Sequence, residues 1–293
     1  MSAGAPSTER NAVATAAFDV RAYTTDPREI RPSDAGLDAL TGLTPTALHV
    51  LADLWRVERS LLDLLRDVLV TPAHADPRVT AFLITWTYEQ FWLAETLAAV
   101  LEANGRPAVE PPGGPLGRLR RTWDDRARPT VAAVRTNLLG ADVTAAHLVT
   151  AWLDAAALTH TYRALAAEEP RLEPLLTRAG GIKARHLAFY ADDAARRLNT
   201  SAGARRLARR AAARWRWPGT RYAPVTAGTA RLVTGHTAAG TAGVGPSAEL
   251  GLAHLDETVA ALPGLADTAP VRGAVDRLGR RRRPAAAASP RRA

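Results

Sequence analysis

Two long stretches of this chain begin in the same way and then carry apolar residues at helical spacing. Thr44-Pro45 and Asp76-Pro77 each place a side chain that can cap a helix before a proline at the first helical position. Leucine, valine and aromatic residues then recur every three or four positions, to about Val70 in the first stretch and to Asn104 in the second. The pattern predicts two long amphipathic helices, which need other helices to cover their apolar faces.

The rest of the chain continues the helical pattern. No stretch alternates apolar and polar residues between turn signals as a β-strand would, and no fixed-period repeat suggests a solenoid. The fold class is therefore expected to be all-α, with long antiparallel helices. Gly180-Gly181 interrupts one helix at a cost of about 1 kcal/mol per glycine relative to alanine, which predicts a bend or a break. Further helices are expected near 116–139, 142–168, 171–199, 204–217 and 247–262.

These segments divide the chain into four parts that differ in apolar periodicity and composition. Residues 1–43 have no sustained apolar period and are expected to form a flexible N-terminal arm, which docking could partly order, without an active site. A helical bundle is expected over 44–199, and a basic helical extension packed on it over 200–278. Residues 279–293 combine an arginine run with an alanine-proline tract, which predicts a disordered tail.

The chain contains no cysteine, which excludes disulfides, thiolate metal sites, iron–sulfur clusters and cysteine nucleophiles. It also has no uninterrupted apolar run long enough for a membrane-spanning helix, and its start does not resemble a secretory signal. A cytoplasmic location is therefore expected. No phosphate-binding glycine loop, nucleophile elbow or metalloprotease motif is present either, which argues against hydrolase and NTPase functions.

Two sequence segments carry a family resemblance, WTYEQFWLAETLAAVLEANG at 86–105 and IKARHLAFYADDAARRL at 182–198. They resemble the second and fourth core helices of actinobacterial ferritin-like proteins related to acyl-carrier-protein desaturases. The likeness extends through Glu58 and into 255–275. It implies a ferritin-like four-helix bundle with additional C-terminal helices. In that family, helices two and four each carry Glu-x-x-His and helices one and three each add a carboxylate, so that one interior site holds two metal ions.

At the positions that correspond to this ligand set, most of the metal-binding groups are missing. Helix three is aligned by counting back from Tyr162, and a one-residue shift there would offer Asp154 instead of an alanine. The six positions are Glu58, Gln90, Leu93, Ala155, Lys183 and His186. Leucine and alanine cannot ligate a metal, and a lysine ammonium repels one, so no di-iron centre is expected. We expect Lys183 to pair with Glu58, with Gln90 as a neutral hydrogen-bonding spacer.

Loss of the ligands leaves several functions open. The leading interpretation is a noncatalytic binding or scaffold protein, either a monomer or a homodimer. The alternative is an oxygen-dependent oxidoreductase with a di-iron or iron/manganese site rebuilt from Glu58, Glu89, Asp154 and His186. Against it, His186 is better explained as a packed or hydrogen-bonded histidine, and Glu89 and Glu95 as solvated residues. A further alternative is radical chemistry, since metal-free ribonucleotide reductase subunits also replace such carboxylates and use a modified tyrosine. The candidates for such a tyrosine in this chain are Tyr88, Tyr162 and Tyr190.

Aromatic residues on the same helices allow two interpretations. They could line a channel for an apolar or acyl ligand, as the desaturase resemblance implies, or they could simply belong to the hydrophobic core, which helical spacing favours. The residues concerned are Trp86, Phe91, Trp92, Phe189 and Tyr190.

A basic segment at 205–217 is the last candidate site. Its arginines, with Trp215 and Trp217, have the composition of a surface that contacts anionic membrane or nucleic acid. The simpler interpretation is a solvated helix packed on the bundle. The possible anion contacts are Arg205, Arg206, Arg209, Arg210 and Arg214.

Overall fold

The computed structural model describes residues 17–69, 76–108, 141–218, 220, 226–234 and 246–280. These residues are all-α, and no β-strand occurs among them, as predicted. No helix in these ranges is long and apolar enough to cross a bilayer. The helix expected near 116–139 and most of the expected tail, 281–293, lie outside the described residues.

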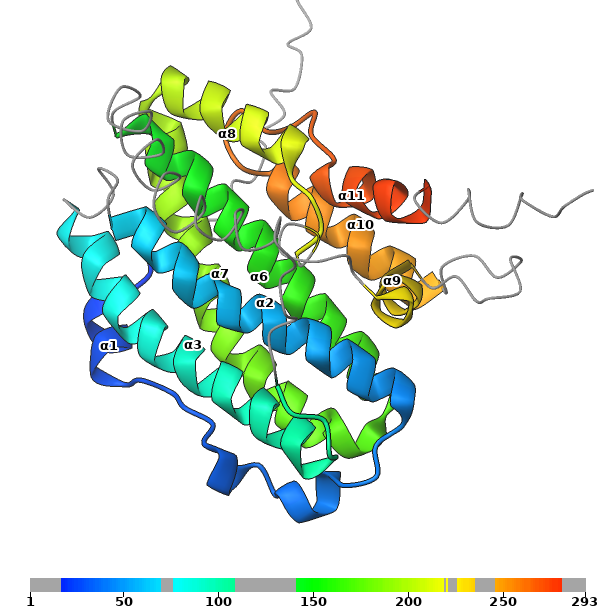
Figure 1. Ribbon diagram of the computed structural model, residues 1–293. Coiled ribbons are helices and arrows are strands. Elements are labelled where there is room, and N and C mark those ends of the chain that lie inside the picture. Colours follow the sequence, from blue (N-terminus) through cyan, green and yellow to red (C-terminus); the bar gives the residue numbers. More distant parts are fainter. Residues whose placement is uncertain are drawn as a thin grey trace, which may run out of the picture.

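Long helices that lie side by side form the body of the protein (Figure 1). They are α2 (Pro45–Leu69), α3 (Pro77–Ala103), α6 (Asp142–Glu168) and α7 (Glu173–Thr200). α2 packs mainly against α3, and α6 against α7. The predicted start of α3 is confirmed, because the Asp76 carboxylate accepts hydrogen bonds from the backbone N–H groups of Arg78 and Val79. Each long helix therefore contributes one face to a shared interior.

The C-terminal part of the chain adds shorter helices on one side of this body (Figure 1). They are α8 (Ala202–Arg214), α9 (Ala227–Thr234), α10 (Pro246–Ala260) and α11 (Pro270–Arg280). α8 packs on α6 and buries Ala204, Ala208 and Ala212, which recur every four residues along one face. The sequence pattern did not indicate α9 or α11, since both are short.

The described part of the N-terminal segment is ordered where it docks on α3. This part, residues 17–43, contains α1 (Val20–Thr25) and two 3-10 turns, Pro32–Asp34 and Leu37–Leu40, and it runs along α3. Figure 1 shows it in dark blue beside that helix. Tyr23, Ile30 and Leu40 are buried there. The segment has no helical period because it is anchored by single apolar side chains rather than by a continuous face, and so it resembled a flexible arm in sequence.

The aromatic residues of the interior divide between core and surface. Trp86, Phe189 and Tyr190 are buried, and the Phe189 ring stacks on Phe82 at 3.8 Å between centroids. Phe91, by contrast, is 43% exposed on α3, in a row of exposed apolar residues with Ile84 and Tyr88. The prediction that these aromatics belong to the core is therefore confirmed for Trp86, Phe189 and Tyr190 and wrong for Phe91. Binding of an apolar or acyl ligand stays a prediction.

No break occurs at Gly180-Gly181, since α7 runs without interruption from Glu173 to Thr200. Packing against α6 holds these residues helical despite their low propensity. A Cβ atom added at either glycine would meet no atom within 4 Å. Both positions therefore carry the entropic cost of glycine without a steric need for it.

Gly181→Ala is accordingly expected to raise the free energy of unfolding by about 1 kcal/mol. Urea unfolding followed by circular dichroism would show a higher midpoint with an unchanged slope. Gly264→Ala is the matched control, because Gly264 has φ +79° and its Cβ would lie 2.7 Å from Cδ of Arg205, so that variant should be less stable than the wild type. A Gly181→Ala protein no more stable than the wild type would contradict the expectation.

Candidate functional site

Four polar side chains meet in the interior, one from each long helix. They are Glu58 from α2, Gln90 from α3, Tyr162 from α6 and Lys183 from α7, and each is at most 1% exposed. The Lys183 Nζ donates to Glu58 Oε2 at 2.7 Å and to Gln90 Oε1 at 2.8 Å. This central cluster confirms the predicted pairing of Lys183 with Glu58, with Gln90 between them.

The remaining bonds of the central cluster converge on Glu58. Gln90 Nε2 donates to the Glu58 backbone carbonyl at 2.9 Å and also to its carboxylate, and the Tyr162 hydroxyl donates to Oε1. Burial and the neighbouring Glu58 charge raise the pKa of Tyr162 well above its ordinary value, so the hydroxyl stays protonated as a donor. Both carboxylate oxygens are thus satisfied by protein groups. The sequence did not reveal this role of Tyr162, which served to align helix three and was one of three candidates for a modified tyrosine.

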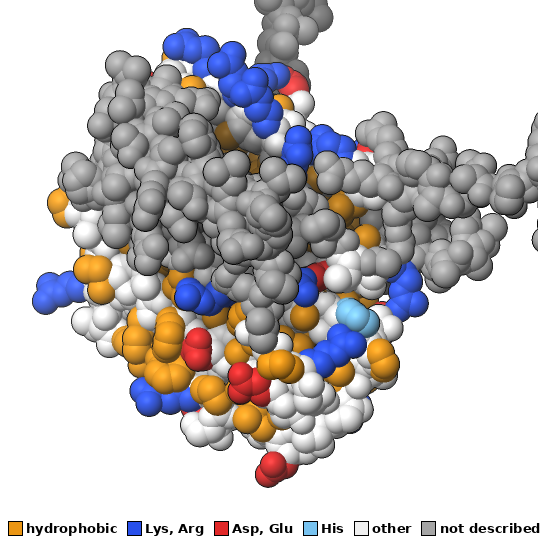
Figure 2. All heavy atoms as spheres, viewed as in Figure 1, with side chains coloured by type: hydrophobic (Ala, Val, Ile, Leu, Met, Phe, Trp, Pro, Cys, Tyr) orange, Lys and Arg blue, Asp and Glu red, His pale blue; other side chains and the backbone are white. Residues whose placement is uncertain are grey.

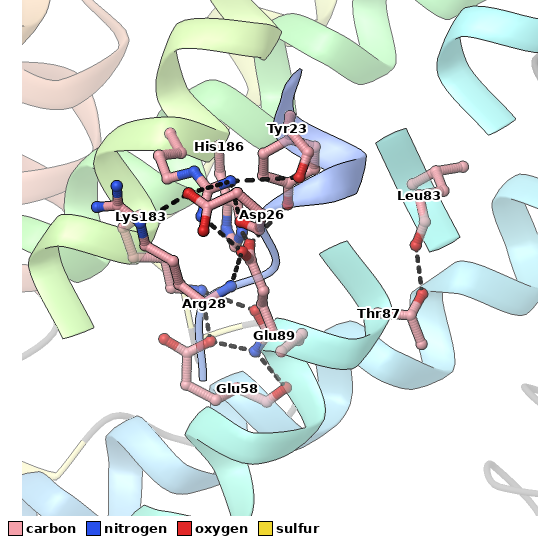
Figure 3. Close-up of polar contacts among 11 residues, drawn as sticks. Tyr23, Asp26, Arg28, Glu58, Leu83, Thr87, Glu89, Lys183 and His186 are labelled. Carbon is pink, nitrogen blue, oxygen red and sulfur yellow. Dashed lines mark hydrogen bonds and ion pairs between the residues drawn. The ribbon is translucent and has the colours of Figure 1, made fainter. Parts of the chain in front are cut away.

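A second buried carboxylate, Glu89, lies beside the first cluster and is shown in Figure 3. The Tyr23 hydroxyl donates to its Oε2 at 2.6 Å, and the Arg28 backbone N–H donates to its Oε1 at 2.8 Å. From α7, Arg185 donates to Oε1 at 3.1 Å, and His186 Nε2 lies 2.7 Å from Oε2. This Glu89 cluster therefore joins the N-terminal segment to α3 and α7.

His186 is completely buried in the Glu89 cluster. Burial lowers its pKa to about 4, against the opposing effect of its hydrogen bond to Glu89, and the Lys183 charge lowers it further. Burial also raises the pKa of Glu89, but the hydrogen bonds from His186, Tyr23 and Arg28 outweigh this and keep it below its ordinary value. At neutral pH the pair is then an ionised carboxylate and a neutral imidazole, whose Nε2 carries the proton because a carboxylate only accepts.

Each cluster is electrically balanced. Glu58 faces the Lys183 ammonium, and Glu89 faces the Arg185 guanidinium, which forms an ion pair with it at 3.1 Å. Lys183 thus supplies inside the protein the positive charge that neutralises Glu58. At two other positions of the expected ligand set, Leu93 and Ala155, the buried side chains have no donor atom.

The alternative ligand set does not come together. Glu58 is held by Lys183, while Glu89 and His186 pair with each other. Asp154 instead accepts a hydrogen bond from Trp215 Nε1 at 2.8 Å, and so faces the extension that follows α8. Throughout the described ranges, no group of three or more histidine, aspartate or glutamate side chains is arranged to hold a metal ion. These partners divide the four residues among separate hydrogen-bond groups, and a metal site rebuilt from them stays a prediction.

Sequence reasoning also placed Glu89 in solvent, and this is wrong, although Glu95 is exposed as expected. Glu89 and Gln90 are neighbours on α3, and neighbouring helical residues normally point in different directions. Both are buried because α2 and α7 cover one side of α3 and the N-terminal segment covers another. The available signal was weak, since only Tyr23 and a few apolar anchors in the N-terminal segment suggested that it packs.

The arginines of α8 divide into two groups. Arg205 donates to the Leu198 carbonyl at 2.6 Å, and Arg209 forms an ion pair with Asp267 at 3.1 Å. The others from the predicted set, Arg206, Arg210 and Arg214, are exposed. Trp215 and Trp217, expected beside them at an interface, are buried instead. The segment is thus a packed helix with a basic outer face, without the exposed aromatics.

We expect Glu89→Gln to loosen the N-terminal segment. The amide has one acceptor oxygen instead of two and brings an unwanted donor toward Tyr23 and Arg28, at a cost of about 2 kcal/mol. Because the segment can open locally, trypsin should cleave after Arg21 and Arg28 about thirty times faster than in the wild type. Glu95→Gln, on the exposed side of the same helix, should leave the rate unchanged. Equal rates for the two variants would show that Glu89 does not hold the segment.

Comparison with family models, with characterised proteins and with solved structures gives no match for this chain.

Proposed function

We propose that this chain is a ferritin-like four-helix bundle in which a buried ion pair takes the place of a di-metal centre, and that it acts as a noncatalytic binding or scaffold protein. The observation that carries the proposal is the position of Lys183, 2.7 Å from Glu58 and 2.8 Å from Gln90. A metal ion at Glu58 would have to displace this ammonium and overcome its repulsion. The central cluster therefore favours a structural role over metal chemistry.

The chemistry of the remaining groups supports the same proposal. Glu58 and Glu89 both have their oxygens occupied by donors from several helices, so neither is poised to accept a proton from a substrate. His186 faces Glu89 and lies among the rings of Tyr23, Phe82 and Trp86. Polar networks in which the buried carboxylates are satisfied in this way hold helices in one arrangement. A rigid body with an exposed apolar row on α3 suits a protein that works by contact.

Metal content tests the proposal directly. Wild-type protein produced in iron- and manganese-supplemented medium, and purified without chelator, should contain essentially no transition metal by plasma mass spectrometry. The combined variant Gln90→Glu, Leu93→His, Ala155→Glu and Lys183→Glu restores the expected ligand types on the four helices. It should gain metal, up to about two ions per chain, if the positions correspond to a ferritin-like centre.

The two proteins separate the parts of the proposal. About two metal ions per wild-type chain would overturn the noncatalytic interpretation and favour an oxidoreductase. A folded variant that binds no metal would instead show that the helices do not have ferritin-like geometry. Circular dichroism of both proteins provides the control for folding.

A further inference from the structure

The outer face of α8 carries a straight row of cations. Arg206, Arg210 and Arg214 follow one another at four-residue intervals, so they lie on one side of the helix, about 6 Å apart along its axis. All three are exposed, and α8 contains no acidic residue. Figure 2 shows lysine and arginine side chains along the edge of the molecule where α8 runs in Figure 1. We call these three residues the α8 arginine row.

Packing does not account for this row. α8 is attached through its opposite face, where Ala204, Ala208 and Ala212 are buried, and it uses Arg205 and Arg209 for contacts with the rest of the fold. No ion pair joins the row to a carboxylate elsewhere in the described part of the chain. Three like charges in a row repel one another, and this repulsion is relieved when a polyanion binds.

We propose that the α8 arginine row binds the phosphate backbone of double-stranded nucleic acid without reading its sequence. A duplex carries about one negative charge per 1.7 Å of its axis, so a row about 12 Å long finds a phosphate near each cation. The guanidinium group matches phosphate geometry with two parallel hydrogen bonds. The proposal concerns the extension and is independent of whether the bundle ever held metal.

An anionic membrane is the less favoured partner. Helices that lie in a membrane interface insert apolar and aromatic side chains beside their basic residues. The apolar face of α8 is instead packed on α6, and Trp215 and Trp217 are 4% and 3% exposed. The exposed face offers charge without an apolar anchor, which suits a phosphate backbone better than a lipid surface.

Salt dependence of binding tests the proposal. Fluorescence anisotropy of a labelled 20-base-pair duplex would be measured with the full chain between about 50 and 200 mM KCl. The triple variant Arg206→Ala, Arg210→Ala and Arg214→Ala should reduce the slope of log K against log salt by about 2.7, and weaken binding at least tenfold at the lowest salt. Arg210→Ala alone should reduce the slope by about 0.9.

A second triple variant is the matched control. Arg59→Ala, Arg163→Ala and Arg272→Ala removes the same charge from exposed positions on other helices and should leave the slope unchanged. The proposal is overturned if wild-type protein does not bind the duplex at about 50 mM salt, or if the two triple variants behave alike. It is also overturned if phosphatidylserine vesicles bind the protein and the duplex does not.

Discussion

Lys183→Met is expected to lower the free energy of unfolding by about 3–5 kcal/mol. Methionine has nearly the same length as lysine but carries no charge, so Glu58 would remain buried with its negative charge uncompensated. The Tyr162 and Gln90 donors would still reach the carboxylate, but neither supplies a positive charge. Urea unfolding at pH 7, followed by circular dichroism, measures the loss as a lower midpoint.

The double variant Glu58→Gln, Lys183→Met separates the effect of the buried charge on stability from the effect of altered packing. It removes both members of the pair, so no buried charge is left alone, and it should recover most of the stability lost by Lys183→Met. Glu95→Gln, an exposed glutamate on α3, serves as a neutral control. If Lys183→Met were within about 1 kcal/mol of the wild type, the ion pair would not be the group that neutralises Glu58.

The central cluster could be predicted because the resemblance to the ferritin-like family places Glu58, Gln90 and Lys183 at one interior site. Their opposite charges and hydrogen-bonding groups then indicated the pairing. Tyr162 was not predicted as a member, since a tyrosine on an apolar helix face is equally suited to simple packing. Its hydroxyl becomes informative only when its position relative to Glu58 is known.

The Glu89 cluster could not be predicted in the same way. Its members come from α1, α3 and α7 and from a backbone N–H at Arg28, so no single helix carries a recognisable motif. Helical periodicity identifies the faces that helices turn to one another, but it does not show that an irregular segment covers a further face. The contact of Asp154 with Trp215 has the same origin, because it depends on how the extension packs on α6.

The two carboxylates have different partners, and this difference affects how the stability of the fold depends on pH. Glu58 faces the Lys183 ammonium, whereas Glu89 shares its oxygens among the Arg185 guanidinium, a neutral histidine and groups of the N-terminal segment. Protonating His186 would add a positive charge to a buried site that already contains Lys183 and Arg185. The folded protein should therefore resist this proton, while the unfolded chain takes it up at the ordinary pKa of histidine.

We accordingly expect His186 to cost the wild type about 3 kcal/mol of stability as pH falls from 6.5 to 4, the window between the ordinary histidine pKa and that of folded His186. In this window His186 binds a proton in the unfolded state but not in the folded state, so its contribution to the free energy of unfolding falls with pH. His186→Gln keeps a donor for Glu89 but cannot titrate, so this variant should lose about 3 kcal/mol less stability than the wild type between pH 6.5 and 4.

Urea midpoints of both proteins at half-unit pH intervals measure the difference, and parallel curves would show that His186 titrates normally in the folded state. Any further loss shared by both proteins at lower pH would fit protonation of Glu89, whose pKa lies below its ordinary value.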